Sequence, residues 1–239
     1  MRFVPGLALA ASLVAAVPAM AQQAAPYGAP VGPWSFGQFY MRGDAGGAFS
    51  AGADLKSTEP FASDSLLGPG ERLNGNTGNS GIFDVGLGAR LLPYLRWDAT
   101  MSYLPSMKFS GSGNAAHMNS WVGMVNGYID LNGFMPQAFG PFQPYVDAGL
   151  GAASNTVDTL DTSLGGGTAI SGNTRTSFAY GLGAGVGYPV APNVTLDVAY
   201  RYLDLGEAET GASDSAGAVA PLKTDLREHT VTMGLRYLF

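Results

Sequence analysis

The sequence predicts a transmembrane β-barrel of eight antiparallel strands in up-and-down order, and three observations lead to this fold class. The last eleven residues, 229–239, place their side chains alternately on two faces, which is the period of a β-strand. Seven further segments alternate in a similar way, and the gaps between them are in turn short and long. The chain also opens with the pattern of an export signal. Together these features are typical of barrels in a bacterial outer membrane.

The first residues have the pattern of a secretory signal peptide. Arg2 gives a positive start, an apolar run follows, and Ala19-Met20-Ala21 forms an A-x-A cleavage site. The apolar run is too short for a helix that crosses a membrane. We therefore predict a cleaved signal peptide over residues 1–21, a flexible lead-in rich in Pro, Ala and Gly over residues 22–35, and the barrel over residues 36–239.

The composition agrees with a barrel in lipid and argues against several classes of function. Charged residues make up 13 % of the chain, against about 25 % in soluble domains. The formal net charge of −6 argues against nucleic acid as a partner, because binding it requires a basic surface. The chain has no cysteine, which excludes disulfides and thiolate sites. The only two histidines, His117 and His229, are far apart in the sequence, so we expect no metal. The glycines at 183–187 lack the spacing of a dinucleotide fingerprint, so we expect no cofactor.

The eight alternating segments define the expected strands in order. Their ranges are 36–49, 81–92, 94–104, 119–131, 142–153, 176–188, 194–205 and 226–239. Short gaps at 92–94, 132–141 and 189–193 predict periplasmic turns, and long gaps at 50–80, 105–118, 154–175 and 206–225 predict extracellular loops. An even number of strands closes the sheet and leaves no unpaired edge in lipid.

The alternation also assigns each strand a lipid face and an inner face. Apolar residues such as Leu87, Leu196 and Met233 are expected to point to lipid. Aromatic residues gather at both ends of the strands, which predicts two girdles at the levels of the lipid headgroups. Their members are Phe49, Tyr103, Trp121 and Tyr202 toward the loops, and Tyr94, Phe142, Tyr188, Tyr237 and Phe239 toward the turns.

The inner face collects most of the charge of the strands. Seven acids and five arginines share it, and an unpaired charge is costly in a narrow, poorly hydrated interior. We therefore predict a network of ion pairs that fills the lumen, with inward glycines making room for the arginines. Its members are Arg42, Asp44, Asp84, Arg90, Arg96, Asp98, Asp130, Asp147, Asp197, Arg201, Glu228 and Arg236.

Three functions are compatible with such a lumen. The first is a non-enzymatic surface protein with a filled core and a structural or interaction role, because eight strands leave only enough width for side chains. The second is a narrow passive channel for small solutes or ions. The third is a lipid-modifying enzyme, which would need His117 or His229 near a hydroxyl group and an acid. The sequence shows no such arrangement, so no catalytic residue is assigned.

Four segments resemble strands of a known family. Residues 39–49, 144–151, 199–206 and 230–239 are similar to the first, fifth, seventh and last strands of the small outer-membrane β-barrel proteins of Gram-negative bacteria, which include opacity-type surface proteins and OmpA-like transmembrane domains. The resemblance implies insertion by the barrel-assembly machinery. It makes an assembly signal of Val231, Met233, Leu235, Tyr237 and Phe239. No peptidoglycan-binding domain follows Phe239, so anchoring to the cell wall is not expected.

The expected location is the outer membrane, reached after export to the periplasm. Outer-membrane lipid and lipopolysaccharide are the expected surroundings. The loops 50–80, 154–175 and 206–225 are candidate contacts for host or other cell surfaces, because they are exposed and rich in Gly, Ser and acidic residues.

Overall fold

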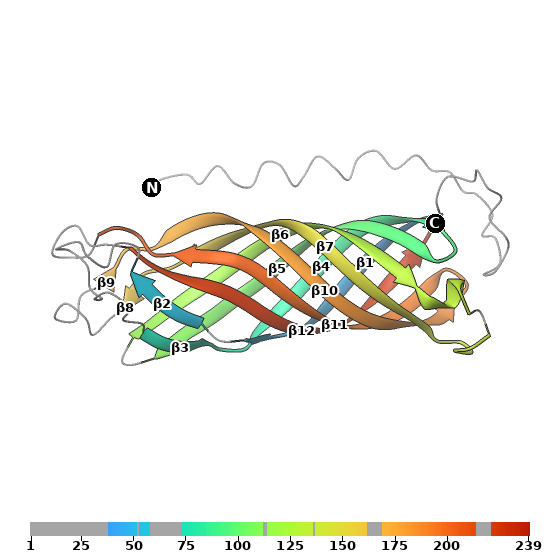
Figure 1. Ribbon diagram of the computed structural model, residues 1–239, viewed down its shortest axis with the longest axis horizontal. Helices are drawn as coiled ribbons and strands as arrows, with labels where there is room; N and C mark the ends of the chain where they lie inside the picture. Colours follow the sequence, from blue (N-terminus) through green and yellow to red (C-terminus); the bar gives the residue numbers. More distant parts are fainter. Residues whose placement is uncertain are drawn as a thin grey trace.

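The computed structural model describes residues 38–51, 53–57, 73–111, 114–135, 137–161, 169–213 and 221–239, and these form a closed β-barrel (Figure 1). The expected signal peptide and lead-in lie outside the described residues. The long strands are β1 (Gln38–Ser50), β4 (Ser80–Leu92), β5 (Leu95–Gly111), β6 (Asn114–Asp130), β7 (Gln143–Val157), β10 (Asn173–Ala191), β11 (Val194–Glu209) and β12 (Leu222–Leu238). Each is antiparallel to its neighbours, and β1 pairs with β12 to close the sheet. The predicted fold class is confirmed.

Four short strands continue the wall on the loop side. β2 (Ala53–Ser57) pairs with β12 and with β3 (Leu73–Thr77), and β3 pairs in turn with β5. This hairpin therefore bridges the space above β1 and β4. β8 (Leu160–Asp161) pairs with β6 and with β9 (Ala169–Ile170). On the turn side, a short 3-10 helix, η1 (Leu131–Gly133), follows β6.

The expected loop at 105–118 was wrong. β5 runs on to Gly111 and β6 starts at Asn114, so the two strands form a hairpin whose register shifts between Leu104 and Met107. A register irregularity is where a strand tolerates a proline, and Pro105 lies in this one. The inward side chain of Met107 is fully buried. Pro105 and the small polar residues after it made the sequence resemble a loop here.

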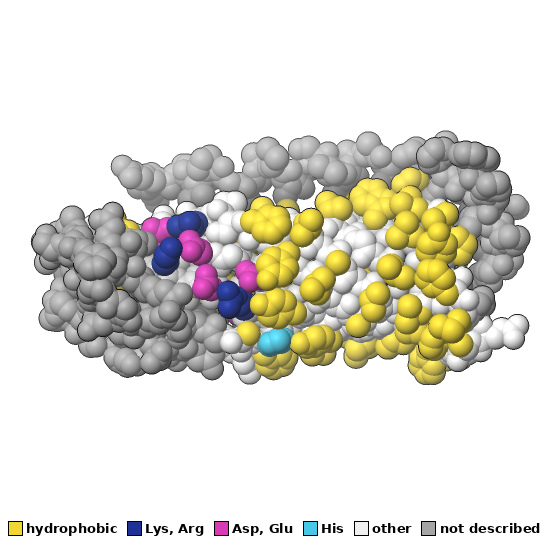
Figure 2. All heavy atoms as spheres, viewed as in Figure 1, with side chains coloured by type: hydrophobic (Ala, Val, Ile, Leu, Met, Phe, Trp, Pro, Cys, Tyr) yellow, Lys and Arg dark blue, Asp and Glu magenta, His cyan; other side chains and the backbone are white. Residues whose placement is uncertain are grey.

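Each long strand exposes large apolar side chains between the two ends of the barrel, and Figure 2 shows this apolar belt on one face. Side chains such as Leu87, Leu150 and Met233 are more than half exposed on the outer surface. Aromatic pairs lie toward both ends, including Tyr103 and Trp121, whose ring centroids are 4.5 Å apart, and Phe142 and Tyr188, at 5.6 Å. Large apolar side chains exposed on a closed barrel are the surface that lipid requires.

No helix among the described residues has the length and the apolar character needed to cross a membrane.

The interior is divided into two halves of opposite polarity. The turn-side half is polar, as expected, but the loop-side half is packed with apolar side chains. We call these the loop-side core. They are Ala48, Ile82, Leu104, Met107, Met118, Val122, Met124, Ala153, Val157, Ile170, Ala179, Leu203, Leu205, Ala208, Leu222 and Leu226.

The loop-side core forms where the strands extend beyond the lipid belt. In β12, Leu222 and Leu226 point inward, whereas Lys223 and Arg227 lie outside. Above the belt the outer surface meets water, so apolar side chains turn to the inside as in a soluble barrel. The expectation of ionic side chains throughout the lumen was therefore incomplete.

Candidate functional site

The turn-side half of the interior holds a polar cluster that we call the lumen network. Each of its five arginines lies within 4.0 Å of a carboxylate. The pairs are Arg42–Asp44 at 2.7 Å, Arg90–Asp130 at 3.9 Å, Arg96–Asp130 at 2.9 Å, Arg236–Asp197 at 3.4 Å, and Arg201–Asp147. Apart from Arg42–Asp44, which lies within β1, these pairs join β4 and β5 to β6, β7 to β11, and β11 to β12.

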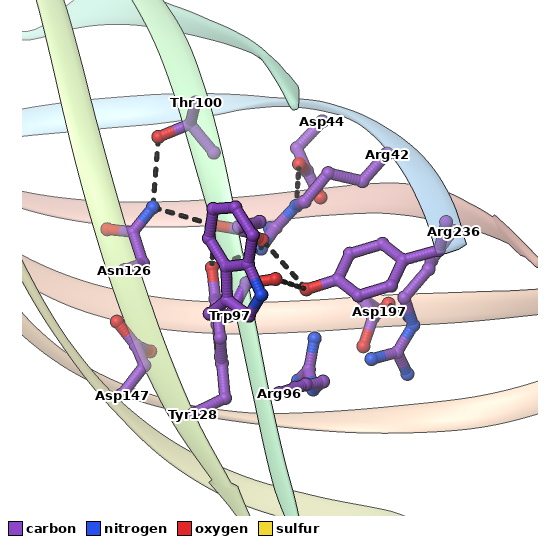
Figure 3. Close-up of polar contacts among 12 residues, drawn as sticks. Arg42, Asp44, Arg96, Trp97, Thr100, Asn126, Tyr128, Asp147, Asp197 and Arg236 are labelled. Carbon is purple, nitrogen blue, oxygen red and sulfur yellow. Dashed lines mark hydrogen bonds and ion pairs between the residues drawn. The ribbon is translucent and has the colours of Figure 1, made fainter. Parts of the chain in front are cut away.

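Asp98 is a central acceptor of the network, and three of its partners, Arg42, Asn126 and Tyr128, are labelled in Figure 3. Its side chain is fully buried. One carboxylate oxygen accepts hydrogen bonds from the Asn126 amide at 2.8 Å and the Tyr128 hydroxyl at 3.1 Å. The other accepts from the Tyr40 hydroxyl at 3.1 Å and lies 3.5 Å from the Arg42 guanidinium. A buried carboxylate with this many donors is well compensated for the loss of water.

Arg96 occupies the centre of an aromatic cage. Only 1 % of its surface is exposed. The guanidinium carbon lies 4.1 Å from the ring centroid of Tyr128 and 4.5 Å from that of Tyr145, while Nε bonds Asp130 at 2.9 Å. Arginine is suited to this position because its planar group can stack on rings and bond a carboxylate at the same time.

Glycines of the inner face provide the space for these large side chains. A Cβ atom at Gly88 would lie 2.6 Å from the ring of Tyr40, and one at Gly185 would lie 2.5 Å from the hydroxyl of Tyr145. Either contact is too short for real atoms. The glycines therefore make room for tyrosines as well as for the arginines that the sequence suggested.

Two of the predicted acids stand apart from these pairs. Asp84 and Glu228 form no ion pair with another residue in the described part of the chain. Within that part, both carboxylate oxygens of Glu228 and one of Asp84 are buried without a hydrogen-bond partner. Glu228 lies between the lumen network and Leu226 of the loop-side core. The structure therefore joins ten of the twelve predicted charges directly into ion pairs.

A small cavity separates the lumen network from the loop-side core. Arg42, Asp84, Tyr145 and Arg201 line it from the polar side, and Leu203 from the apolar side. Above the cavity most of the interior is apolar, and the buried polar side chains Ser120 and Asn155 bond each other at 2.7 Å. Removing an ion from water is costly where few free polar groups replace the water.

Sequence reasoning missed the uncharged members of the network. Tyr40, Tyr128, Tyr145 and Asn126 are all buried inside the barrel. A signal for them was present, because Tyr128 is two residues from Asp130, and Tyr145 two from Asp147, so each pair shares one face of its strand.

Neither histidine forms a catalytic arrangement within the described residues. His117 is exposed on β6, and its neighbour Ser120 is buried, with its hydroxyl bonded to Asn155 at 2.7 Å. His229 lies on the outer surface, where its Nδ1 is 2.7 Å from the Tyr200 hydroxyl. In the same part of the chain, no group of three or more His, Cys, Asp or Glu side chains could hold a metal ion.

The predicted assembly residues lie on one side of the last strand. Val231, Met233, Leu235, Tyr237 and Phe239 are all exposed on the outer surface. The ring centroids of Tyr237 and Phe239 are 5.4 Å apart, edge to face, at the turn-side end of the belt.

Comparison with known proteins supports the structural assignment. Residues 7–239 match the family described as outer membrane protein beta-barrel domain. An uncharacterized protein of Brucella suis is 32 % identical over 197 residues, covering 66 % of this chain and 68 % of the relative. A putative adhesin of Rickettsia conorii is 27 % identical over 215 residues, covering 84 % and 82 %.

Solved structures show the same fold. The crystal structure of Neisserial surface protein A is similar with a TM-score of 0.51 and 22 % identity, over 84 % of this chain and 97 % of that one. Its likeness supports the closed barrel described above. With its apolar belt, its polar turn-side lumen and the match over residues 7–239, this chain belongs to the outer membrane protein β-barrel domain family and is a protein of the bacterial outer membrane.

Proposed function

We propose that the protein is a non-enzymatic adhesin of the outer membrane, which uses the loop end of its barrel to contact other surfaces. The observation that carries this proposal is the loop-side core. It lets the wall continue above the lipid belt as a packed, rigid support. Function in proteins often resides in loops that such a scaffold positions. The putative adhesin of Rickettsia conorii among the relatives supports the same role.

Cell binding tests the adhesin role. The protein is produced in a non-adherent bacterium, and binding to cultured epithelial cells is measured. Replacing residues 58–72, 162–168 and 214–220 with short Gly-Ser linkers leaves the described strands in place. We expect binding by the intact protein and its loss in the replaced variant. A control variant, Val85→Ala in the lipid belt, should bind normally. Equal binding by intact and replaced proteins would remove the adhesin proposal.

The lumen gives a second test, because it distinguishes a filled support from a narrow channel. We infer that the loop-side core blocks ions, since apolar side chains fill most of it and the buried polar groups Ser120 and Asn155 bond each other. In planar lipid bilayers the purified protein should give no reproducible conductance steps. Steps of constant size would favour the channel instead.

Assembly and lipid contacts complete the proposal. The outward row from Val231 to Phe239 supports recognition of the last strand by the barrel-assembly machinery, as the family resemblance implies. Lipopolysaccharide is the proposed neighbour above the belt. Phe239→Ala should lower the amount of protein in the outer membrane, measured by fractionation, whereas Phe134→Ala on the turn side should not.

A further inference from the structure

The barrel wall contains a seam above the lipid belt, between β10 and β11. The two strands pair from Tyr180 with Asp204 to Ala191 with Val194. On the loop side of Tyr180, residues 173–179 of β10 pair with β7, and residues 207–209 of β11 pair with β12. We call the meeting of residues 173–179 with residues 205–209 the β10–β11 seam. Along these residues no paired register links β10 to β11.

A β-bulge produces the seam. Leu205 and Gly206 lie opposite the single residue Leu226, between the pairs Asp204–Arg227 and Glu207–Asp225. Gly206 has a φ of 70°, a left-handed conformation that glycine adopts readily. A Cβ atom there would lie 2.6 Å from the Cβ of Ser177. The bulge thus bends β11 out of register with β10 while keeping the two strands close.

Side chains take over the role of the missing backbone pairing. Asn155, which is buried on β7, donates from its amide to the carbonyl oxygens of Leu205 at 2.9 Å and Glu207 at 3.2 Å. Its own oxygen accepts from the Ser120 hydroxyl at 2.7 Å. The Ser177 hydroxyl donates to the Glu207 carbonyl at 2.9 Å. These bonds form the inner clasp of the seam.

Charged side chains close the outer side. Arg175 crosses the seam to the carboxylates of Glu207, at 2.9 Å, and Glu209. Lys223 bonds Glu207 at 3.1 Å. About 40 % of the Arg175 side chain is exposed to water, where ion pairs are weak and are screened by salt. Figure 2 shows charged side chains gathered beside the apolar belt.

The seam is joined again at its upper end and has the loop-side core behind it. Ser171 accepts from the Gly211 amide at 2.7 Å and donates to the Ser213 carbonyl at 2.8 Å. Ala179, Leu205 and Ala208 lie behind the seam, each 1 % exposed or less. The clasp and the outer ion pairs therefore hold the two strands together in front of these apolar side chains.

We propose that the loop-side half of the barrel opens laterally at the β10–β11 seam, and that Asn155 holds it shut. Opening breaks side-chain contacts and leaves the ladders on either side intact. It presents the loop-side core at the upper edge of the lipid belt. Asn155 is a positioning residue in this device, because it acts through the carbonyl groups of β11.

Thiol reactivity tests the opening, since the chain has no cysteine of its own. Ala208→Cys places a thiol behind the seam. Ala48→Cys is the matched control, because Ala48 is equally buried but pairs on both sides, with Thr230 of β12 and Ser80 of β4. With N-ethylmaleimide and protein in lipid vesicles, we expect Ala208→Cys to react at least about tenfold faster. Adding Asn155→Ala should raise the reaction rate of the Ala208→Cys thiol about tenfold further. Adding Ser177→Ala should raise the same rate by a smaller factor.

A disulfide clamp tests the same opening by a second readout. The hydroxyl oxygens of Ser171 and Ser213 are 3.1 Å apart, so Ser171→Cys with Ser213→Cys can close the upper end of the seam. Amide hydrogen exchange of residues 173–179 and 205–209 should be slower in the oxidised than in the reduced form. Equal reactivity of the two thiols, no effect of either clasp variant, or no effect of the clamp would each overturn the proposal. Heat-modifiable migration on a gel shows that every variant has folded.

Discussion

At the scale of single residues, the interior depends on how buried charge is compensated. Arg96 has an acid and two rings around it, and Asp98 has several donors. The alternation of the strands was enough to place both inside. It did not identify their partners, because contacts across a lumen depend on the register of strands that are far apart in sequence. The tyrosines were missed because only charged residues were assigned to the network of the inner face.

The buried pair of Arg96 and Asp130 gives a prediction at this scale. Arg96→Ala leaves a buried carboxylate without this partner and empties the aromatic cage, so it should lower the free energy of unfolding by about 3–5 kcal/mol. Arg227→Ala is the control. Its side chain is 50 % exposed and lies 3.2 Å from the Asp204 carboxylate, so its loss should be about 1 kcal/mol or less. Urea unfolding in lipid vesicles measures both, and equal losses would contradict this account.

At the scale of the strands, alternation predicted eight long strands in the correct order. It failed where a strand is irregular. Pro105 led to the prediction that β5 ends there, and Gly206 led to the same prediction for β11, although both strands continue. Proline and glycine usually mark turns, and only the positions of the neighbouring strands show that a bulge is present instead. The loop-side wall was therefore read as loop.

The bulge at Gly206 carries the prediction at the scale of an element. Gly206→Ala places a Cβ on a left-handed residue and against Ser177, so it should lower the free energy of unfolding by about 1–3 kcal/mol. Gly123→Ala is the control, because a Cβ there meets no atom within 4 Å, and it should be neutral to within about 0.5 kcal/mol. Equal stability of the two variants would show that the bulge does not need glycine.

At the scale of the whole molecule, the barrel reverses its polarity along its axis. In the lipid belt, apolar side chains face out and the lumen network lies inside. Above the belt, charged side chains lie outside and the loop-side core lies inside. The sequence could not reveal this reversal, because side chains alternate between inside and outside in both halves. Only the surroundings of the outer face differ, lipid in one half and water in the other. The relevant boundary is the outer aromatic girdle.

The belt and its boundary can be measured with the native tryptophans. Trp97 lies within the belt, and Trp121 lies in the girdle toward the loops, with 41 % and 52 % of their surfaces exposed. Variants with a single tryptophan, made by Trp→Phe substitution at the other positions, are refolded into vesicles of brominated lipids. Bromine deep in the acyl chains should quench Trp97 more strongly, and bromine near the headgroups should quench Trp121 more strongly. If brominated lipids quench neither Trp97 nor Trp121, the central claim that lipid surrounds this belt is contradicted.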